Sequence, residues 1–377
     1  MKVRKKIIFL ISVQLARVMC FFRGKANQIP TQPKKIVIVQ LSKLGDMVCT
    51  TPMFRAIKEK YSAVVVFVIG DKVNASLLKD HPYVDQYIVS HKNFLSLLRR
   101  LRKEDIDFAC TCAPNIVALL LLLLSGIRCI AAPKVQNGQS PYENTYYLSL
   151  LPYVIQKPHT MGQYAPREYL RLLEPIGIVT DDTSKQLGFS SAAKERIKQF
   201  FTEQKIDPTT HQVVGISPSA GNKIKCWDPK RFAEVAQHIV SNFAAHVIII
   251  GSPADQPLVD AMMSSLSSAE RVINTCGMFT LEELKALVAA SHLFISVDSG
   301  PIYIAEAFGV ATIDIVGPMD ENEQPPRGER HRVVVTARKK PELHIMNARQ
   351  YDAVEARRQV EDITVPMVTK EVDALLQ

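Results

Sequence analysis

The sequence predicts an α/β protein with two domains, each built on a mainly parallel sheet covered by helices. Short apolar runs of strand length alternate with helical stretches, which is typical of parallel sheets. The alternation pauses after residue 131 and resumes at residue 213. The length of 377 residues also suits about two domains of roughly 150 residues each.

In the N-terminal half, the apolar runs are the expected strands and the stretches between them are the expected helices. The strands are expected at 36–41, 64–70, 83–89, 106–112 and 127–131. The helices are expected at 52–61, 93–103, 116–125, 166–176 and 191–204, with a loop-rich region at 133–166. The leucine run 119–124 is far too short to span a membrane and is interpreted as a buried helix.

The C-terminal half repeats the alternation. The strands are expected at 213–217, 246–251, 293–297 and 312–317. The helices are expected at 229–243, 255–267, 281–291, 348–361 and 366–376. Thr280 and Glu283 have the spacing of a capping box at the start of the third of these helices. We expect the domain boundary near 185–210.

The net charge of +9 is concentrated at the N-terminus. Nine of the 46 basic residues and none of the 37 acidic residues lie in residues 1–35, so the remainder is formally neutral. A nucleic-acid-binding protein would be expected to spread basic residues over a folded domain, so no nucleic-acid partner is predicted. The cysteines number seven and form no C-x-x-C pair, which favours reduced thiols in a cytoplasmic protein.

The basic N-terminal stretch also has an amphipathic helical pattern. The apolar side of its helical wheel consists of Ile7, Ile8, Ile11, Leu15, Val18, Met19 and Phe22. Polar and basic residues lie broadly opposite, although Phe9, Leu10 and Val13 interrupt that side. The stretch is shorter than the ~20 residues of a spanning helix, and Arg17 interrupts it. We expect residues 1–33 to be a tail anchored on an anionic membrane surface, with a signal peptide, a signal anchor or a dispensable tail as alternatives.

The first candidate loop, 42–51, follows the first expected strand. Open α/β sheets bind their ligands at the carboxyl ends of the strands. Gly45 is expected to let the backbone turn tightly there, and Asp46 places one carboxylate at the strand end. From spacing alone, Asp46 is either a helix cap or a functional acid. The helix begins either near it or at Thr51, with Pro52 in its first turn.

A second candidate loop, 217–232, follows the first expected strand of the C-terminal half. Lys223 and Lys225 precede a helix that Asp228 and Pro229 are expected to open. Positive charge beside a helix N-terminus favours phosphate, although an ordinary basic loop has the same pattern. No G-x-x-x-x-G-K-[ST] is present, so this loop is not a P-loop.

Two more candidate loops follow strands. In the loop 251–256, Asp255 is either a ligand for a ribose hydroxyl or a helix cap. After the strand 293–297, Asp298 is followed by Ser299 and Gly300 at the start of a helix with Pro301 in its first turn. The backbone N–H groups at such a helix start can bind an anion.

Other chemistries have little support. The motif Asp105-x-Asp107 resembles the D-x-D of metal-dependent sugar transferases, but it precedes a strand instead of following one. The nine histidines show no zinc-ligand spacing, and no nucleophile-elbow pattern supports Ser-His-Asp catalysis. No metal site is therefore predicted.

Four stretches resemble, in the same order, the motifs of glycosyltransferase family 9, the bacterial heptosyltransferases. They are VIVQLSKLGDMVCTTPMFRAIK, VVGISPSAGNKIKCWDPKRFAEVA, HVIIIGSPADQ and VDSGPIYIAEAFGVATIDIVGP. The resemblance covers about 34–338, and the combination is specific although each piece alone is not. It implies the GT-B fold, in which two Rossmann-like domains with parallel sheets face each other across a cleft. The acceptor would bind to 34–190 and the nucleotide sugar to 205–340, with C-terminal helices at 341–377.

The resemblance implies an inverting, metal-independent transfer of a heptose-type sugar. The donor would be an ADP-sugar, and the acceptor a lipopolysaccharide-core-like glycolipid or another cell-envelope saccharide; no cofactor is implied. Asp46 matches the family's proposed general base, Lys225 its phosphate-binding lysine and Asp255 its acid near the ribose. The implied donor-binding residues are Ser219, Lys225, Asp255, Asp298, Ser299, Gly300 and Tyr303. The implied acceptor loop contains Ser42, Lys43 and Gly45.

Two departures from the family pattern leave alternatives open. The family usually has histidine at the position of Tyr303 and a small residue at that of Glu306. Tyr303 can donate a hydrogen bond but carries no positive charge at neutral pH, and Glu306 adds a negative charge one turn away. The alternatives are a GT-B transferase for another nucleotide sugar or a non-catalytic sugar-nucleotide-binding relative. Because the donor would be cytoplasmic, we expect a cytoplasmic enzyme that is peripheral on the inner face of the cytoplasmic membrane.

Overall fold

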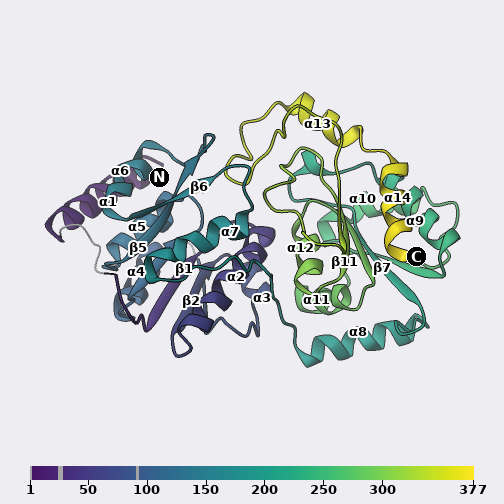
Figure 1. Cartoon of the computed structure of the whole chain (residues 1–377), viewed down its shortest axis with the longest axis horizontal. Coiled ribbons are helices and arrows are strands. Elements are labelled where there is room, and N and C mark those ends of the chain that lie inside the picture. Colours follow the sequence, from purple (N-terminus) through teal and green to yellow (C-terminus); the bar gives the residue numbers. More distant parts are fainter. Residues whose placement is uncertain (1, 24–28, 91–92) are drawn as a thin grey trace. The chain divides into compact units, whose positions relative to one another are not determined.

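The computed structural model describes residues 2–23, 29–90 and 93–377, and the chain divides into two compact units (Figure 1). The N-terminal unit comprises Met1–Ser184 together with Ile345–Arg349. The C-terminal unit comprises Lys185–His344 and Gln350–Gln377. Each unit has its own parallel six-stranded sheet and its own apolar core.

The sheet of the N-terminal unit has the strand order β3-β2-β1-β4-β5-β6. Its strands are β1 (Lys35–Val39), β2 (Val65–Gly70), β3 (Gln86–Val89), β4 (Phe108–Thr111), β5 (Ile130–Gln136) and β6 (Ile155–Thr160). Its helices are α1 (Lys2–Arg23), α2 (Leu44–Lys60), α3 (Lys72–Leu77), α4 (Phe94–Lys103), α5 (Ile116–Leu124), α6 (Thr145–Leu150) and α7 (Ala165–Leu170), with 3₁₀ turns η1 (Leu151–Tyr153) and η2 (Arg171–Ile176). The leucines of α5 are buried, which confirms the expected buried helix.

The expectation of a loop-rich stretch at 133–166 is wrong. It contains the end of β5, the helix α6, the strand β6 and the start of α7. β6 pairs only with β5 at the edge of the sheet, and its sequence IQKPHT includes a proline and little apolar character. Edge strands tolerate both features because one side faces no partner strand, so the apolar pattern that reveals buried strands is missing here.

The sheet of the C-terminal unit has the order β12-β11-β10-β7-β8-β9. Its strands are β7 (Gln212–Ser217), β8 (Ala245–Ile249), β9 (Val272–Asn274), β10 (Leu293–Val297), β11 (Ala311–Ile315) and β12 (His331–Val334). Its helices are α8 (Ser191–Glu203), α9 (Pro229–Asn242), α10 (Gln256–Met263), α11 (Leu281–Ala289), α12 (Gly300–Ala307), α13 (Ala353–Glu361) and α14 (Val365–Leu376), with 3₁₀ turns η3 (Lys223–Lys225) and η4 (Pro253–Asp255). The capping box of Thr280 and Glu283 is confirmed, as is the Asp228 cap of α9.

α1 packs against α5 and α6 in the N-terminal unit (Figure 1). Val13, Ala16 and Cys20 are buried in the core of that unit, and Phe9 packs beside them. Phe9 and Val13 are two of the residues that interrupted the polar side of the helical wheel, and their contact with the protein explains why they are apolar. No helix among the described residues is long and apolar enough to cross a membrane.

Candidate functional site

The stretch 42–51 is mostly helical, which favours the helix start near Asp46 over a start at Thr51 and corrects the expectations for a tight turn at Gly45, a first turn at Pro52 and a cap at Asp46. α2 begins at Leu44, so Gly45 and Asp46 lie in its first turn, and Pro52 lies inside the helix and not near its start. The N-cap residue is Lys43, so Asp46 is not the cap. Pro52 has no N–H to donate to the Val48 carbonyl; the Thr51 hydroxyl donates a 2.8 Å hydrogen bond to that oxygen instead.

Buried polar contacts fix the first turn of α2 against the end of β1. Gln40, which is 1% exposed, donates from Nε2 to Thr50 Oγ1 at 3.1 Å. Thr50 Oγ1 in turn donates to the Asp46 carbonyl oxygen at 2.8 Å, and Gln40 Oε1 accepts from the Ser42 N–H at 3.2 Å. Gln40 therefore holds both ends of the turn that presents Asp46. Gln40 is not among the residues predicted from the sequence, where its only signal was a polar residue at the end of an apolar run.

Asp46 lines a cavity of about 410 Å³ within the N-terminal unit. The Tyr169 hydroxyl lies 3.5 Å from Asp46 Oδ1. The cavity is also lined by Leu41, Ser42, Lys43, Thr111, Ala113, Pro114, Asn115, Tyr142, Ile345, Met346, Ala348 and Arg349. The predicted residues Ser42 and Lys43 are thus brought together with Asp46, whereas Gly45 does not line the cavity. Ile345–Arg349 come from far along the chain, and no local pattern could have placed them here.

The predicted donor-binding residues lie at the carboxyl ends of β7, β8 and β10, which are neighbours in the sheet. Lys225 Nζ donates a 2.7 Å hydrogen bond to Asp298 Oδ2, and the Tyr303 hydroxyl donates to Asp298 Oδ1. Asp298 and Tyr303 are buried, and the Lys225 side chain is 16% exposed. Each oxygen of the Asp298 carboxylate thus accepts a hydrogen bond, and Asp298 holds the Lys225 ammonium at the strand ends.

Asp255 combines a structural contact with a place in the same site. Its carboxylate accepts from the Ser252 N–H and hydroxyl in a capping box at 3.0 and 2.6 Å, and Lys223 Nζ lies 3.5 Å away. Burial alone would raise the pKa of Asp255, but hydrogen bonds from Ser252 and Ser219 and the charge of Lys223 lower that pKa overall. The structure thus brings Ser219 and Asp255 together. Asp255 takes part in the capping box of η4 with Ser252, but its side chain makes no capping hydrogen bond to α10, the helix that it was expected to cap. A ribose contact stays a prediction.

The start of α12 offers backbone donors beside these residues. Ser299 is the N-cap, but its side chain makes no capping hydrogen bond to the helix; its hydroxyl lies 3.2 Å from that of Ser296. Asp314 on β11, the strand next to β10, is fully buried, and neither of its carboxylate oxygens has a hydrogen-bond partner among the described residues. Burial, and then the nearby charge of Asp298, raise the pKa of Asp314 well above its usual value, which favours the neutral form of this carboxyl.

The structure shows what accompanies the two departures at Tyr303 and Glu306. Lys185 Nζ lies 2.5 Å from Glu306 Oε2, and the Lys185 side chain is fully buried. The same ammonium lies 5.9 Å from the centroid of the Tyr303 ring. The negative charge expected from Glu306 is therefore paired with Lys185 inside the C-terminal unit.

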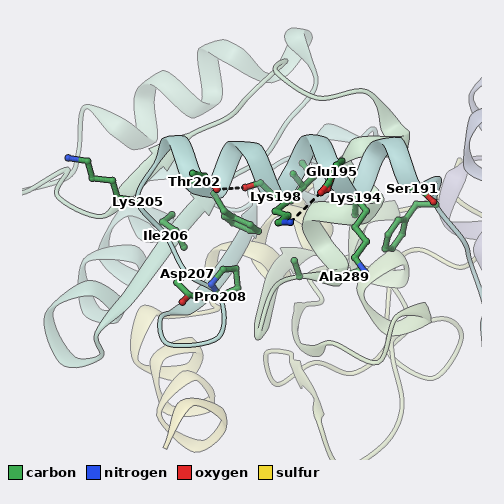
Figure 2. Close-up of a pocket in the computed structure, with 15 residues that line it drawn as sticks. Ser191, Lys194, Glu195, Lys198, Thr202, Lys205, Ile206, Asp207, Pro208 and Ala289 are labelled. Carbon is green, nitrogen blue, oxygen red and sulfur yellow. Dashed lines mark hydrogen bonds and ion pairs between the residues drawn. The ribbon is translucent and has the colours of Figure 1, made fainter.

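A cavity of about 940 Å³ in the C-terminal unit contains none of the predicted site residues (Figure 2). It lies between α8, the segment that enters β7, and the end of α11, with Ile206, Pro208 and Ala289 in its wall. These segments precede strands, so the cavity is at the amino ends of the strands, opposite to the donor-binding residues.

Asp107, from the D-x-D motif, also precedes its strand, β4. Its carboxylate accepts hydrogen bonds from the N–H groups of Lys34 and Lys35 at 2.7 and 2.9 Å, so the contacts observed for Asp107 hold the backbone at the start of β1.

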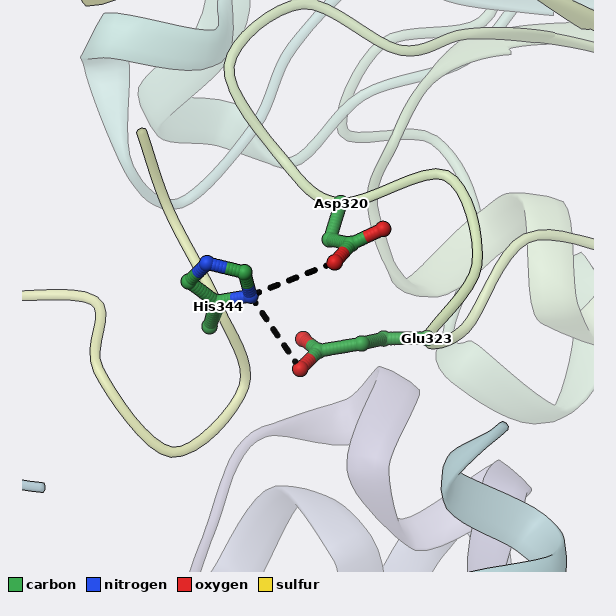
Figure 3. A group of neighbouring side chains, drawn as sticks. All are labelled: Asp320, Glu323 and His344. Carbon is green, nitrogen blue, oxygen red and sulfur yellow. Dashed lines mark hydrogen bonds and ion pairs between the residues drawn. The ribbon is translucent and has the colours of Figure 1, made fainter. Parts of the chain in front are cut away.

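One group of described residues could share a metal ion: Asp320, Glu323 and His344, whose ligand atoms lie within 4.8 Å of one another (Figure 3). His344 Nδ1 lies 3.3 Å from both Asp320 Oδ2 and Glu323 Oε1. Hydrogen bonds to Asp320 and Glu323 raise the pKa of His344 to about 9, so at neutral pH the protonated imidazole balances one of the two carboxylate charges. A metal would have to displace that proton. The histidine spacing alone did not reveal this group.

The two units share one architecture, a parallel sheet with candidate residues at the carboxyl ends of its strands. One unit presents a carboxylate in a cavity, and the other presents a lysine and helix starts suited to phosphate. This combination defines a GT-B glycosyltransferase, as the sequence predicted.

The comparisons with known proteins give the family. Residues 94–351 match the model of glycosyltransferase family 9 (heptosyltransferase), and the chain belongs to that family. Lipopolysaccharide heptosyltransferase 3 of Escherichia coli is 23% identical over 73% of this chain and 81% of its own. The crystal structure of the family 9 glycosyltransferase of Veillonella parvula has a TM-score of 0.75 at 20% identity, over 91% of this chain and 97% of that one. The E. coli ADP-heptose lipopolysaccharide heptosyltransferase II has a TM-score of 0.71 at 20% identity, over 91% and 98%.

Proposed function

We propose that this enzyme transfers a heptose-type sugar from an ADP-sugar to a saccharide of the lipopolysaccharide core, with inversion and without a metal. The observation that carries the proposal is the position of Asp46 in a cavity at the carboxyl end of β1. Relatives described as lipopolysaccharide heptosyltransferases support the sugar and the acceptor, and a fold neighbour named for ADP-heptose supports the donor.

Asp46 is the general base in this proposal. An acceptor hydroxyl in the cavity would donate its proton to the Asp46 carboxylate while its oxygen forms the new bond to the anomeric carbon. The bond from that carbon to the diphosphate breaks on the opposite face, which inverts the configuration. Gln40 and Thr50 contribute by holding the turn of Asp46 in place.

The donor site stabilises the departing diphosphate. Lys225 and the N–H groups at the start of α12 supply fixed positive charge without a metal. Ser219, Asp255 and Tyr303 belong to the same proposed site, with Asp255 near the ribose. The pairing of Glu306 with Lys185 favours an active enzyme over a non-catalytic relative, because the extra acid is compensated and does not oppose the phosphates.

Turnover assays with ADP-, UDP- and GDP-sugars in the presence of EDTA test this function. We expect release of ADP that depends on a lipopolysaccharide-core acceptor and is unchanged by EDTA. Release of UDP or GDP instead would favour another nucleotide sugar, and binding without release would favour a non-catalytic relative. Loss of activity on chelation would contradict the metal-independent transfer, and Asp320, Glu323 and His344 would then be the candidate metal ligands.

We also propose that α1 lies on the anionic inner surface of the cytoplasmic membrane and holds a cytoplasmic enzyme beside a lipid-linked acceptor. The face of α1 that points away from the protein core is apolar, with exposed side chains at helical spacing: Ile8, Ile11, Leu15, Val18 and Phe22. Their exposed fractions run from 50% for Leu15 to 81% for Phe22. Nine basic residues and no acid in residues 1–35 supply the attraction to anionic lipid.

Substitutions on this face test the anchor better than deletion, because removing α1 would uncover the core that Val13, Ala16 and Cys20 help to form. We expect the unaltered protein to pellet with vesicles of phosphatidylglycerol and to be partly released in high salt. Ile11→Glu with Leu15→Glu should reduce vesicle binding about 10-fold or more, since each loses the burial of an apolar side chain. Val179→Glu is the matched control, because Val179 is 83% exposed in the same unit. Equal binding by all three proteins would end the anchor proposal.

A further inference from the structure

The segment Ile345–Arg349 belongs to the N-terminal unit, although the residues on both sides of it belong to the C-terminal unit. We call this segment the strap. Four of its five residues line the cavity that contains Asp46. The Ser140 hydroxyl donates a 2.6 Å hydrogen bond to the Met346 carbonyl oxygen, and both residues are buried. The strap is therefore a fixed wall of the cavity.

Two exposed cationic side chains line the same cavity, Arg349 from the strap and Lys43 from the start of α2. The Arg349 guanidinium carbon lies 4.9 Å from the centroid of the Tyr142 ring, which also lines the cavity. Among the residues that the structure describes, neither cation forms an ion pair. This cation–π contact with Tyr142 uses none of the guanidinium N–H donors, so these stay available to a ligand.

We propose that the strap completes the acceptor site, and that Arg349 together with Lys43 binds an anionic group of the acceptor, either a phosphate or a carboxylate. The planar fork of an arginine fits both groups through paired hydrogen bonds. The two cations also offset the negative charge of Asp46 in the same cavity, which would otherwise repel an anionic acceptor. The inference rests on the proposed function, because it takes the cavity to be the acceptor site. It adds that Arg349 and Lys43 select among acceptors.

Calorimetry of acceptor binding to the ADP-loaded enzyme tests this without requiring transfer. The probe is lipid-free core oligosaccharide from lipopolysaccharide, used intact, after removal of its phosphates and after reduction of its carboxylates. We expect the intact form to bind about 10- to 100-fold more weakly to Arg349→Gln, the range for a lost charge-assisted hydrogen bond. If removal of the phosphates weakens binding to the unaltered enzyme but has little further effect on Arg349→Gln, the bound group is a phosphate. If reduction of the carboxylates has that effect instead, the bound group is a carboxylate.

Arg99→Gln is the matched control, because Arg99 is exposed on α4 of the same unit and does not line the cavity. It should bind all forms as the unaltered enzyme does. Ser140→Ala should weaken acceptor binding and leave ADP binding unchanged, since it frees the strap without touching its cation. In transfer assays, Arg349→Gln should raise the KM for the acceptor and leave kcat and the KM for the donor nearly unchanged.

The inference and the proposed function fail in different ways. If Arg349→Gln binds the intact oligosaccharide as tightly as the unaltered enzyme, or if the unaltered enzyme binds none of the three forms, the inference is overturned. A transferase that is indifferent to Arg349 would leave the proposed function standing. Conversely, Arg349-dependent binding with no sugar transfer would support the anion site and contradict the proposed transfer.

Discussion

An Asp46→Asn variant is expected to bind ADP normally and to transfer the sugar about 10²–10⁴-fold more slowly, the loss typical of removing a general base. The amide has the shape of the carboxylate but cannot accept the proton of the acceptor hydroxyl at neutral pH. Lys43 and not Asp46 is the N-cap of α2, and asparagine keeps the shape of aspartate and a side-chain oxygen that accepts hydrogen bonds, so this change should leave α2 intact. Single-turnover rates with saturating acceptor, together with calorimetric ADP affinity, measure the two effects separately.

Glu59→Gln is the matched control for that variant. Glu59 lies on α2 as well, is 65% exposed and forms a surface ion pair with Arg55 at 3.6 Å. Surface ion pairs of this kind contribute little, so its thermal midpoint and turnover should stay near those of the unaltered enzyme. Turnover by Asp46→Asn within a few-fold of this control would exclude Asp46 as the base.

The sequence predicted most of the fold because its main elements carry local patterns. Buried parallel strands such as β1 and β7 are continuous apolar runs, and the helix after β7, α9, begins with a recognisable cap, Asp228. The carboxyl ends of those strands then indicated where ligands bind. For that reason Asp46, Lys225 and Asp298 could be selected from the sequence, before the contacts that each of them makes were known.

The missing parts depend on tertiary contacts. β6 is stabilised by its pairing with β5 and lacks the apolar run of a buried strand. The start of α2 was misplaced because Pro52 normally marks a first turn; here the Thr51 hydroxyl satisfies the carbonyl that the proline leaves without a donor. The strap could not be predicted, because its place beside Asp46 depends on the chain returning to the N-terminal unit after nearly the whole C-terminal unit.

α1 shows the same limit within a single helix. Its sequence pattern gave one apolar side, with apolar residues such as Phe9 and Val13 interrupting the opposite, polar side. In the structure, Phe9 and Val13 pack against the core of the N-terminal unit, and the main apolar side is exposed. A helical wheel cannot tell which apolar side meets protein, since both lower their free energy by leaving water. The contact with α5 and α6 decides it.

The second large effect is expected at the donor site. Lys225→Met should weaken ADP binding by about 1.5–3 kcal/mol, or roughly 10- to 150-fold, because it removes the charge that would contact the diphosphate. Methionine keeps an unbranched apolar side chain of similar length, so the packing of that stem is largely preserved. The Lys223→Met control should have a much smaller effect, since the Lys223 side chain is 69% exposed and its ammonium is 3.5 Å from Asp255.

Loss of Lys225 should also lower the stability of the protein, separately from its effect on ligand binding. Its ammonium pairs with Asp298, whose side chain is 2% exposed. Lys225→Met therefore leaves a buried carboxylate that accepts from the Tyr303 hydroxyl but has lost its ion pair, which should lower the thermal midpoint without ligand. Adding Asp298→Asn removes that unpaired charge and should restore much of the stability while ADP binding stays weak. If the double variant instead regains ADP affinity, or if Lys225→Met binds ADP as tightly as the unaltered enzyme, the diphosphate does not bind at Lys225.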